Sequence, residues 1–119
     1  MVVGAYLILG IDRFADDVKR KRAGVADVVT NYLGDAHEIL RGMPGEVDIA
    51  FIDADKPSTQ SYFDLLWPKI RVGGCVIVDN ATTHRKDLWE FVHGVRNRAD
   101  ANSTEVAVGN GIEWIIKIS

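Results

Sequence analysis

The chain has 119 residues, of which 47% are hydrophobic and 26% charged, and its net charge is −3 at pH 7. This length suits one globular domain. The net negative charge does not favour binding to nucleic acid or to acidic membrane surfaces, whose protein partners are usually basic. The single cysteine, Cys75, excludes an internal disulfide, and no apolar run reaches the ~20 residues of a membrane span, so we expect a cytoplasmic protein.

The first third of the sequence predicts two strands separated by a helix. Residues 5–11 form an apolar run typical of a buried strand, and this run ends at Asp12. Residues 14–23 follow as a short helix, which Gly24 closes. Residues 27–33 are rich in β-branched and aromatic side chains, which favours a second strand.

A short helix and a buried strand come next. Asp35 is expected to cap the helix, because Glu38 follows it at the capping-box spacing. Apolar residues with helical spacing extend this helix over residues 36–43. The nearly continuous apolar run that begins at Val47 and ends at Asp53 is typical of a strand covered on both faces.

The second half of the sequence continues the alternation of helices and strands. Residues 57–70 carry a helix that begins near a proline, and residues 72–79 form another buried strand. Residues 86–98 show the clearest amphipathic helix pattern in the chain. Residues 105–108 and 112–118 are predicted strands on either side of a Gly-Asn-Gly turn, which indicates a hairpin.

This order of elements predicts the fold class. Strands that alternate with helices indicate an α/β fold with a mostly parallel sheet and right-handed crossovers. The hairpin at the end of the chain adds an antiparallel strand to that sheet.

Polar side chains follow two of the predicted buried strands. Asp53 and Lys56 come after one strand, and Asp79 and Asn80 end another. Ligands of open α/β sheets bind at the carboxyl ends of strands, so these residues predict a site. Alternatively, each carboxylate only caps the residues after its strand, but clustered carboxylates are costly without a cation, which favours the site.

Six motifs connect the chain to a known family. They are GID (10–12), AGV (23–25), GDA (34–36), VDIAFIDADK (47–56), GGCVIVDN (73–80) and VGNGIEWIIKI (108–118). Together they resemble the class I S-adenosylmethionine-dependent methyltransferases, and within them the metal-dependent O-methyltransferases related to catechol and caffeoyl-CoA O-methyltransferases. The resemblance implies a Rossmann-like methyltransferase fold that lacks the family's first strand and its glycine-rich loop, which would precede Val3.

The resemblance implies that S-adenosylmethionine is the methyl donor. Asp12 matches the acidic residue that binds the ribose hydroxyls of the donor, although a turn carboxylate explains it equally well. Asp35 and Ala36 match the residues beside the adenine, and Asp35 can cap its helix as well. Asp53 is placed near both the donor and the metal.

The resemblance also implies a divalent cation, with Mg²⁺ favoured. Asp53, Asp79 and Asn80 match the three protein ligands of this ion, and oxygen ligands suit a hard cation. Lys56 matches the lysine that helps to deprotonate the acceptor hydroxyl. His84 is a second candidate for that proton transfer, with loop filler as the equal alternative.

The expected function is therefore O-methylation of a small, catechol-like hydroxyl acceptor, with no nucleic-acid or membrane partner. The alternative is a non-catalytic methyltransferase remnant that works as an oligomeric or partner-dependent binding module. A receiver-like signalling domain with Asp53 as phosphoacceptor is a third interpretation, which the closing hairpin disfavours.

The missing first strand has a structural consequence. In the complete fold it lies between the strands that end at Asp12 and Asp53. Without it, these two strands must pair directly or something else must fill the slot, because an unpaired buried edge is costly. We therefore expect either a rearranged sheet or a homo-oligomer in which a second chain covers that edge.

Overall fold

The computed structural model describes residues 6–8, 32 and 34–119. The helix expected at residues 14–23 and Asp12 lie outside this part, as does the strand expected at 27–33 apart from Tyr32. The described elements are β1 (Tyr6–Ile8), α2 (Ala36–Gly42), β2 (Val47–Ile52), η1 (Lys56–Ser58), α3 (Thr59–Leu66), η2 (Trp67–Lys69), β3 (Ile70–Asp79), α4 (Trp89–Arg96), β4 (Ala101–Val106) and β5 (Ile112–Lys117).

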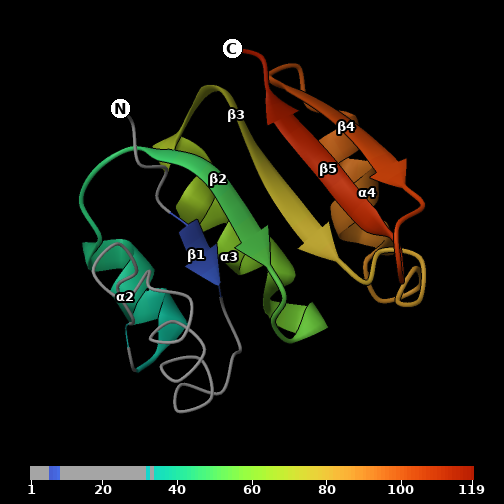
Figure 1. Cartoon of the computed structure of the whole chain (residues 1–119), viewed down its shortest axis with the longest axis horizontal. Coiled ribbons are helices and arrows are strands. Elements are labelled where there is room, and N and C mark those ends of the chain that lie inside the picture. The colour runs from blue at the N-terminus through green and yellow to red at the C-terminus, as the bar shows by residue number, and fades with distance from the viewer. Residues whose placement is uncertain (1–5, 9–31, 33) are drawn as a thin grey trace, which may run out of the picture.

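Five strands form one sheet in the order β1-β2-β3-β5-β4 (Figure 1). β1, β2 and β3 run parallel to one another, whereas β5 is antiparallel to both β3 and β4. The predicted α/β fold, with its parallel strands and its closing antiparallel hairpin, is confirmed.

β1 and β2 pair directly. Tyr6 lies opposite Ile49 in this parallel ladder, and Ile8 lies opposite Phe51. The sheet is therefore rearranged, which is one of the two outcomes expected from a missing strand between them. The other outcome, a homo-oligomer, stays a prediction.

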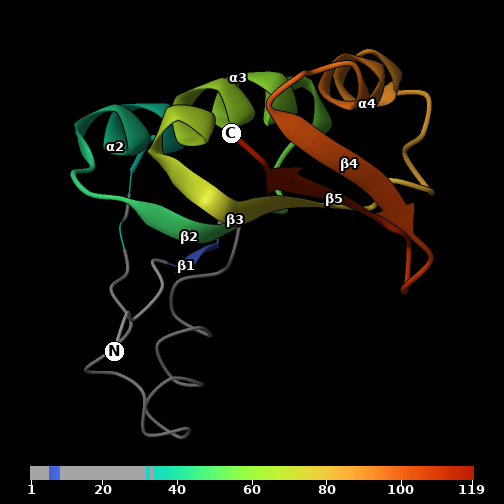
Figure 2. The same cartoon turned by 90° about the horizontal axis from the view of Figure 1, so that it is seen from above.

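The helices α2, α3 and α4 all lie on one side of the sheet (Figure 2). The core between these two layers is apolar, and its largest fully buried side chains include Leu40, Ile52, Phe63, Leu66, Val76 and Ile115. Phe63 stacks on Trp67 with 4.9 Å between ring centroids and meets Phe91 edge-on at 5.4 Å. These aromatic contacts join α3 to α4 within the core.

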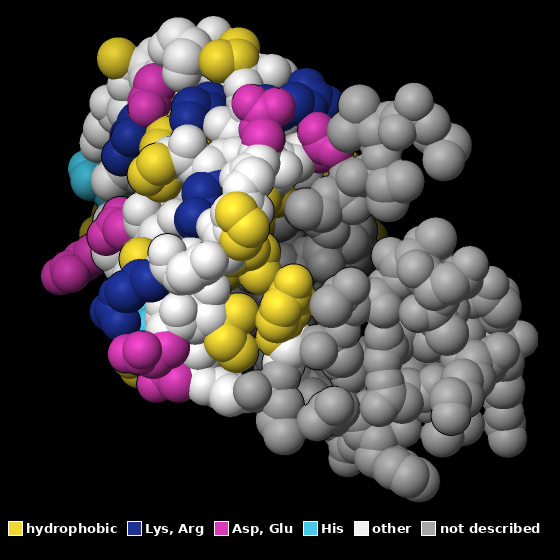
Figure 3. Space-filling view, turned by 90° about the vertical axis from the view of Figure 1, so that its left-hand side faces the viewer, with side chains coloured by type: hydrophobic (Ala, Val, Ile, Leu, Met, Phe, Trp, Pro, Cys, Tyr) yellow, Lys and Arg dark blue, Asp and Glu magenta, His cyan; other side chains and the backbone are white. Residues whose placement is uncertain are grey.

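Some large apolar side chains of the sheet stay exposed. Ile49 of β2 is 39% exposed and Trp114 of β5 is 41% exposed. Figure 3 shows several hydrophobic side chains gathered near the middle of the face that it draws. None of the helices in the described ranges is both long and apolar enough to cross a membrane.

Several predicted boundaries are wrong, including the ends of α4 and β4, which lie at Arg96 and Val106 rather than at residues 98 and 108. α4 begins at Trp89 rather than at residue 86, because residues 81–88 form turns. β3 begins at Ile70, which was expected to end the preceding helix. β4 begins at Ala101 instead of residue 105, although its first residues are mainly polar, because the strand pairs with β5 along its whole length.

A buried ion pair fastens α4 to the sheet. The Glu113 side chain is fully buried on the helix side of β5. Arg96, in the last turn of α4, donates from Nη2 to both carboxylate oxygens of Glu113, at 2.7 and 2.9 Å. Its Nε donates to Oε1 at 3.1 Å. The guanidinium thereby compensates a carboxylate that has no contact with solvent.

We predict that Arg96→Met lowers the free energy of unfolding by about 3 kcal/mol, because it leaves the Glu113 carboxylate buried without a partner. Arg41→Met is the matched control, since Arg41 pairs with Glu38 at 3.4 Å on the surface, and its loss should cost less than about 0.5 kcal/mol. Urea denaturation measures both values. Equal losses would contradict the assigned role of Arg96.

A second carboxylate anchors the start of β4. Asp100 accepts hydrogen bonds from Arg98 Nε and Nη2, at 2.8 and 2.9 Å, and from Trp67 Nε1 at 2.8 Å. The hydrogen bonds from Arg98, followed by that from Trp67, hold the pKa of Asp100 well below its usual range. The ionised carboxylate is therefore the form that the folded protein favours.

Because the folded pKa of Asp100 is lowered, its stabilising effect is present at neutral pH and is lost as the pH falls below about 4. We predict that Asp100→Asn lowers the melting temperature at pH 7 and that the difference from the wild type shrinks at pH 3. Thermal unfolding followed by circular dichroism measures this. Asp64→Asn, at a surface carboxylate that contacts Gln60, should show no such trend. If the wild type and Asp100→Asn differed in melting temperature by the same amount at pH 7 and pH 3, the ionised carboxylate of Asp100 would not be the stabilising group.

Candidate functional site

The carboxyl ends of β2 and β3 bring two acidic residues to the same edge of the sheet. Ile52 lies opposite Val78 in the parallel ladder. Asp53, the residue after β2, and Asp79, the last residue of β3 and opposite Ile112 of β5, therefore lie at the same level. The Asp53 side chain is exposed and that of Asp79 is half-buried. This is the arrangement expected from the sequence.

Asn80 links this edge to the final hairpin. Its Nδ2 donates to Asp53 Oδ1 at 3.4 Å, and its Oδ1 accepts from Asn110 Nδ2 at 3.2 Å. The backbone of Asn80 has a φ of 60°, a left-handed conformation that asparagine tolerates better than most residues. Asn80 therefore occupies a turn that sends its side chain back toward Asp53.

The turn before β5 braces the residues after Asn80. Ala81 N donates to Gly111 O at 2.9 Å, and Thr82 N donates to Asn110 O at 3.1 Å. No pattern in the sequence indicated a role for Asn110. The only signal was the Gly-Asn-Gly turn, which was interpreted as a hairpin connection alone.

Lys56 lies at the same sheet edge. Its Nζ donates to the backbone oxygen of Asp79 at 3.1 Å. The preceding residue, Asp55, caps η1 by accepting from Ser58 N at 3.2 Å and from Ser58 Oγ at 2.5 Å, and the bond from the Ser58 hydroxyl lowers the pKa of Asp55. A capped turn thus fixes the segment that carries Lys56 next to the end of β3.

His84 is less closely tied to this group. The imidazole is exposed, and its Nδ1 lies 3.1 Å from Asp87 Oδ2. The backbone N–H of His84 donates to Asn80 O at 2.9 Å. Within residues 34–119, the polar contact of its ring is with Asp87 rather than with a member of the strand-end group.

Asp35 and Ala36 lie at the start of α2. Asp35 Oδ1 accepts from His37 N at 2.8 Å and from Glu38 N at 3.3 Å, which confirms the predicted helix cap. The Glu38 side chain contacts Arg41. Ala36 is half-buried and packs against the core. The role of these residues beside a donor adenine stays a prediction, as does the role of Asp12.

Three side chains at this edge of the sheet could bind a divalent cation. Asp53, Asp79 and Asn80 supply oxygen atoms, which suit Mg²⁺. Within the described ranges neither Asp53 nor Asp79 pairs with a cationic side chain, and no three His, Cys, Asp or Glu side chains converge to hold an ion. The chemistry of the three side chains suits an oxygen-bound cation with two carboxylates and one amide, but the Asn80 amide, whose Nδ2 points to Asp53, would have to turn its oxygen toward that residue.

A pocket of about 130 Å³ lies beyond Ala81, on the side of α4. It is lined by Ala81, Arg85, Trp89, Val92, Arg96, Glu105 and Glu113. Its charged groups already pair with each other, Arg85 with Glu105 and Arg96 with Glu113. None of the predicted site residues lines this pocket, so we assign it no ligand.

Comparisons with known proteins point to one family. A family model described as "Methyltransferase domain" matches residues 4–81. The flavonoid 3',5'-methyltransferase of Vitis vinifera is 35% identical over 84 residues, which cover 60% of this chain and 36% of that protein. A caffeoyl-CoA O-methyltransferase of Stellaria longipes is 33% identical over 86 residues, which cover 65% of this chain and 36% of that protein.

A solved structure gives the same result. The O-methyltransferase TomG of Streptomyces achromogenes, in complex with SAM, superposes with a TM-score of 0.74 and 27% identity, covering 89% of this chain and 58% of that one. The chain thus spans about a third of the length of the curated relatives it matches and about 58% of TomG.

Two glycines with left-handed backbones give a matched test of the turn that braces Asn80. A Cβ at Gly111 would lie 2.6 Å from Thr82 Cβ, whereas a Cβ at Gly109 would meet open space. We predict that Gly109→Ala costs about 1 kcal/mol through its backbone conformation, and that Gly111→Ala costs about 2 kcal/mol more through overpacking. Urea denaturation measures both. Equal costs would show that the contact with Thr82 is unimportant.

Proposed function

The chain belongs to the methyltransferase domain family, and from this premise we propose that it binds S-adenosylmethionine and transfers the methyl group to a hydroxyl of a small acceptor. The observation that supports this most is the group formed by Asp53, Lys56, Asp79 and Asn80 at one edge of the sheet. Similarity to O-methyltransferases, including one in complex with SAM, supports the reaction class.

The donor is proposed to bind across the carboxyl ends of the parallel strands, as ligands do in open α/β sheets. Asp12 would accept from the ribose hydroxyls, and Asp35 with Ala36 would flank the adenine. Asp35 is exposed at the start of α2, so its carboxylate is accessible from solvent. The donor supplies an activated methyl group on a sulfonium.

A divalent cation, with Mg²⁺ favoured, is proposed to be held by Asp53, Asp79 and Asn80. When bound, such an ion lowers the pKa of an acceptor hydroxyl and stabilises the negative charge that develops there. Two neighbouring oxygens on the acceptor would suit this ion, which favours a catechol-like substrate.

Lys56 is proposed to take the proton of the acceptor hydroxyl on its Nζ, in the neutral amine form. The present hydrogen bond to Asp79 O keeps this nitrogen at the edge that carries Asp53 and Asn80. His84 is the second candidate, but its ring contacts Asp87. We therefore favour Lys56, whose contribution as a general base would be about 10²- to 10⁴-fold in rate.

The alternative function is a non-catalytic binding module that has kept the fold of the family. The direct pairing of β1 with β2 favours it, because the strand that the resemblance places between them is not present there. This alternative differs from the proposal in one testable respect, which is transfer of the methyl group.

A methyl-transfer assay with radiolabelled S-adenosylmethionine, catechol and Mg²⁺ tests the proposal. We expect transfer that is abolished by EDTA and lowered at least about 100-fold in kcat/KM by Asp79→Asn or Lys56→Met. Lys86→Met, at an exposed lysine, is the matched control and should retain full activity. Methyl transfer that continues in the presence of EDTA would refute the proposed dependence on a divalent cation. A folded protein that binds the donor without transferring the methyl group would support the binding module.

A further inference from the structure

We propose that His37 is a positioning residue that locks the start of α2 to the start of α3, and so fixes Asp35 relative to the segment that carries Lys56. The inference deepens the proposed function and rests on it, because Asp35 is assigned there to the donor. His37 itself belongs to neither the proposed donor residues nor the proposed metal ligands.

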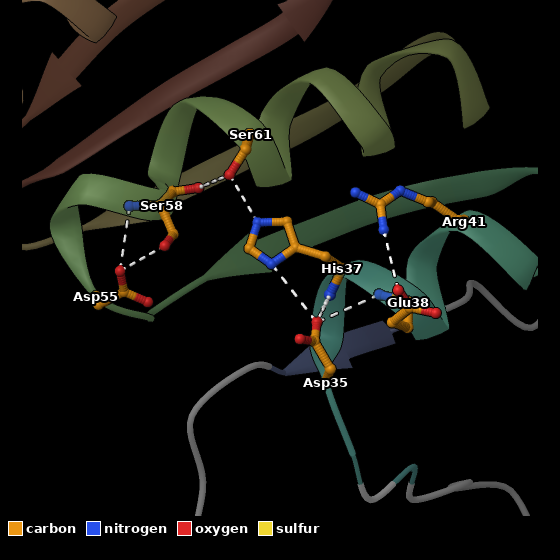
Figure 4. Close-up of polar contacts among 7 residues, drawn as sticks. All are labelled: Asp35, His37, Glu38, Arg41, Asp55, Ser58 and Ser61. Carbon is orange, nitrogen blue, oxygen red and sulfur yellow. Dashed lines mark hydrogen bonds and ion pairs between the residues drawn. The ribbon is translucent and has the colours of Figure 1, made fainter.

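The first contact of this lock joins two helices. His37 Nε2 lies 2.7 Å from Ser61 Oγ, although the two residues are 24 positions apart in the sequence (Figure 4). Ser61 Oγ donates its hydrogen to Ser58 O at 2.9 Å. Because a hydroxyl has a single hydrogen to donate, Ser61 must accept from the ring. His37 therefore carries a proton on Nε2.

Two further contacts hold the imidazole in place. Its Nδ1 lies 3.6 Å from Asp35 Oδ1, the same oxygen that accepts from His37 N at 2.8 Å. One face of the ring stacks on Tyr62, with centroids 4.3 Å apart and planes inclined by 24°. The ring is only 27% exposed. It is thus fixed by α2 on one side and by α3 on the other.

Tyr62 provides an uncharged platform for this ring. It is buried, and this burial, together with the carboxylates of Asp55 and Asp35, raises the pKa of its phenol. The phenol therefore stays neutral at physiological pH, and the stack with His37 does not depend on its ionisation.

The same hydrogen bonds continue to Asp55, the residue before the proposed proton acceptor. Ser61 bonds to Ser58, and Ser58 donates from N and Oγ to Asp55, the residue before Lys56. Figure 4 shows this path from Asp35 through the ring to Asp55. A shift of α2 would thus change the position of Asp35 relative to the segment that carries Lys56.

An acid, a histidine and a serine in this order also have the residue types of a hydrolytic triad. That function does not fit the contacts. The Ser61 hydrogen points to the backbone oxygen of Ser58, and the ring donates to Ser61 instead of accepting its proton. The group is therefore suited to holding two elements together and not to activating a nucleophile.

The first test determines which nitrogen of the His37 ring carries the proton, in the protein without S-adenosylmethionine. Long-range ¹H–¹⁵N NMR should show that His37 carries its proton on Nε2 and that this proton is hydrogen-bonded. In Ser61→Ala, the chemical shift of this proton should lose the contribution of the hydrogen bond. A neutral His37 that carries its proton on Nδ1 would overturn the inference.

Calorimetric titration of S-adenosylmethionine then tests the positioning role. His37→Ala and Ser61→Ala should each raise the Kd about 10-fold, which corresponds to 1.4 kcal/mol. The double variant should be no weaker than either single one, because both changes break one link. His37→Gln, which restores a donor toward Ser61, should regain most of the affinity. His93→Ala is the control, since His93 is an exposed histidine stacked on Trp89 in α4.

The outcomes separate this inference from the proposed function. Donor binding by folded His37→Ala and Ser61→Ala variants at wild-type affinity would overturn the positioning role alone. If His37→Gln bound S-adenosylmethionine as weakly as His37→Ala does, the hydrogen bond between His37 and Ser61 would not be the contact that positions Asp35. A wild-type protein in which the His37 ring carries its proton on Nε2 but which binds no S-adenosylmethionine would refute both the proposed function and the positioning role of His37.

Discussion

The register between β2 and β3 is the constraint on which the rest of the structure depends. It places Asp53 and Asp79 at one edge of the sheet, and a shift by one residue would turn every side chain of a strand to the opposite face. Gly74 permits this register where the ladder is irregular. A Cβ at Gly74 would lie 2.6 Å from Asp48 O, so only glycine lets β3 approach β2 this closely.

Two connections from the final hairpin support this edge. The turn before β5 holds the backbone of Ala81 and Thr82 and contacts the Asn80 side chain through Asn110. On the helix side, Glu113 of β5 receives Arg96 from α4. The antiparallel hairpin therefore does more than extend the sheet, because it determines where the chain goes after Asn80.

Sequence patterns predicted those elements whose structure depends on residues close together in the chain. The apolar runs of β2 and β3, and the charged residues directly after them, are visible in the sequence without knowledge of the fold. The polar start of β4 was missed, because pairing with β5 and not hydrophobicity makes it a strand. The contacts of Asn110 with Asn80 and of His37 with Ser61 were also missed, since they join residues 30 and 24 positions apart.

The direct pairing of β1 with β2 raises the central question about function, because the resemblance places another strand and a glycine-rich loop between them. Calorimetric titration of S-adenosylmethionine into the wild-type protein, with and without Mg²⁺, tests the account most directly. We expect binding in the micromolar range, because the strand-end group and the start of α2 are in place despite the rearranged sheet. Absence of binding at millimolar donor would contradict the account and favour a chain that has kept the fold of the family without its chemistry.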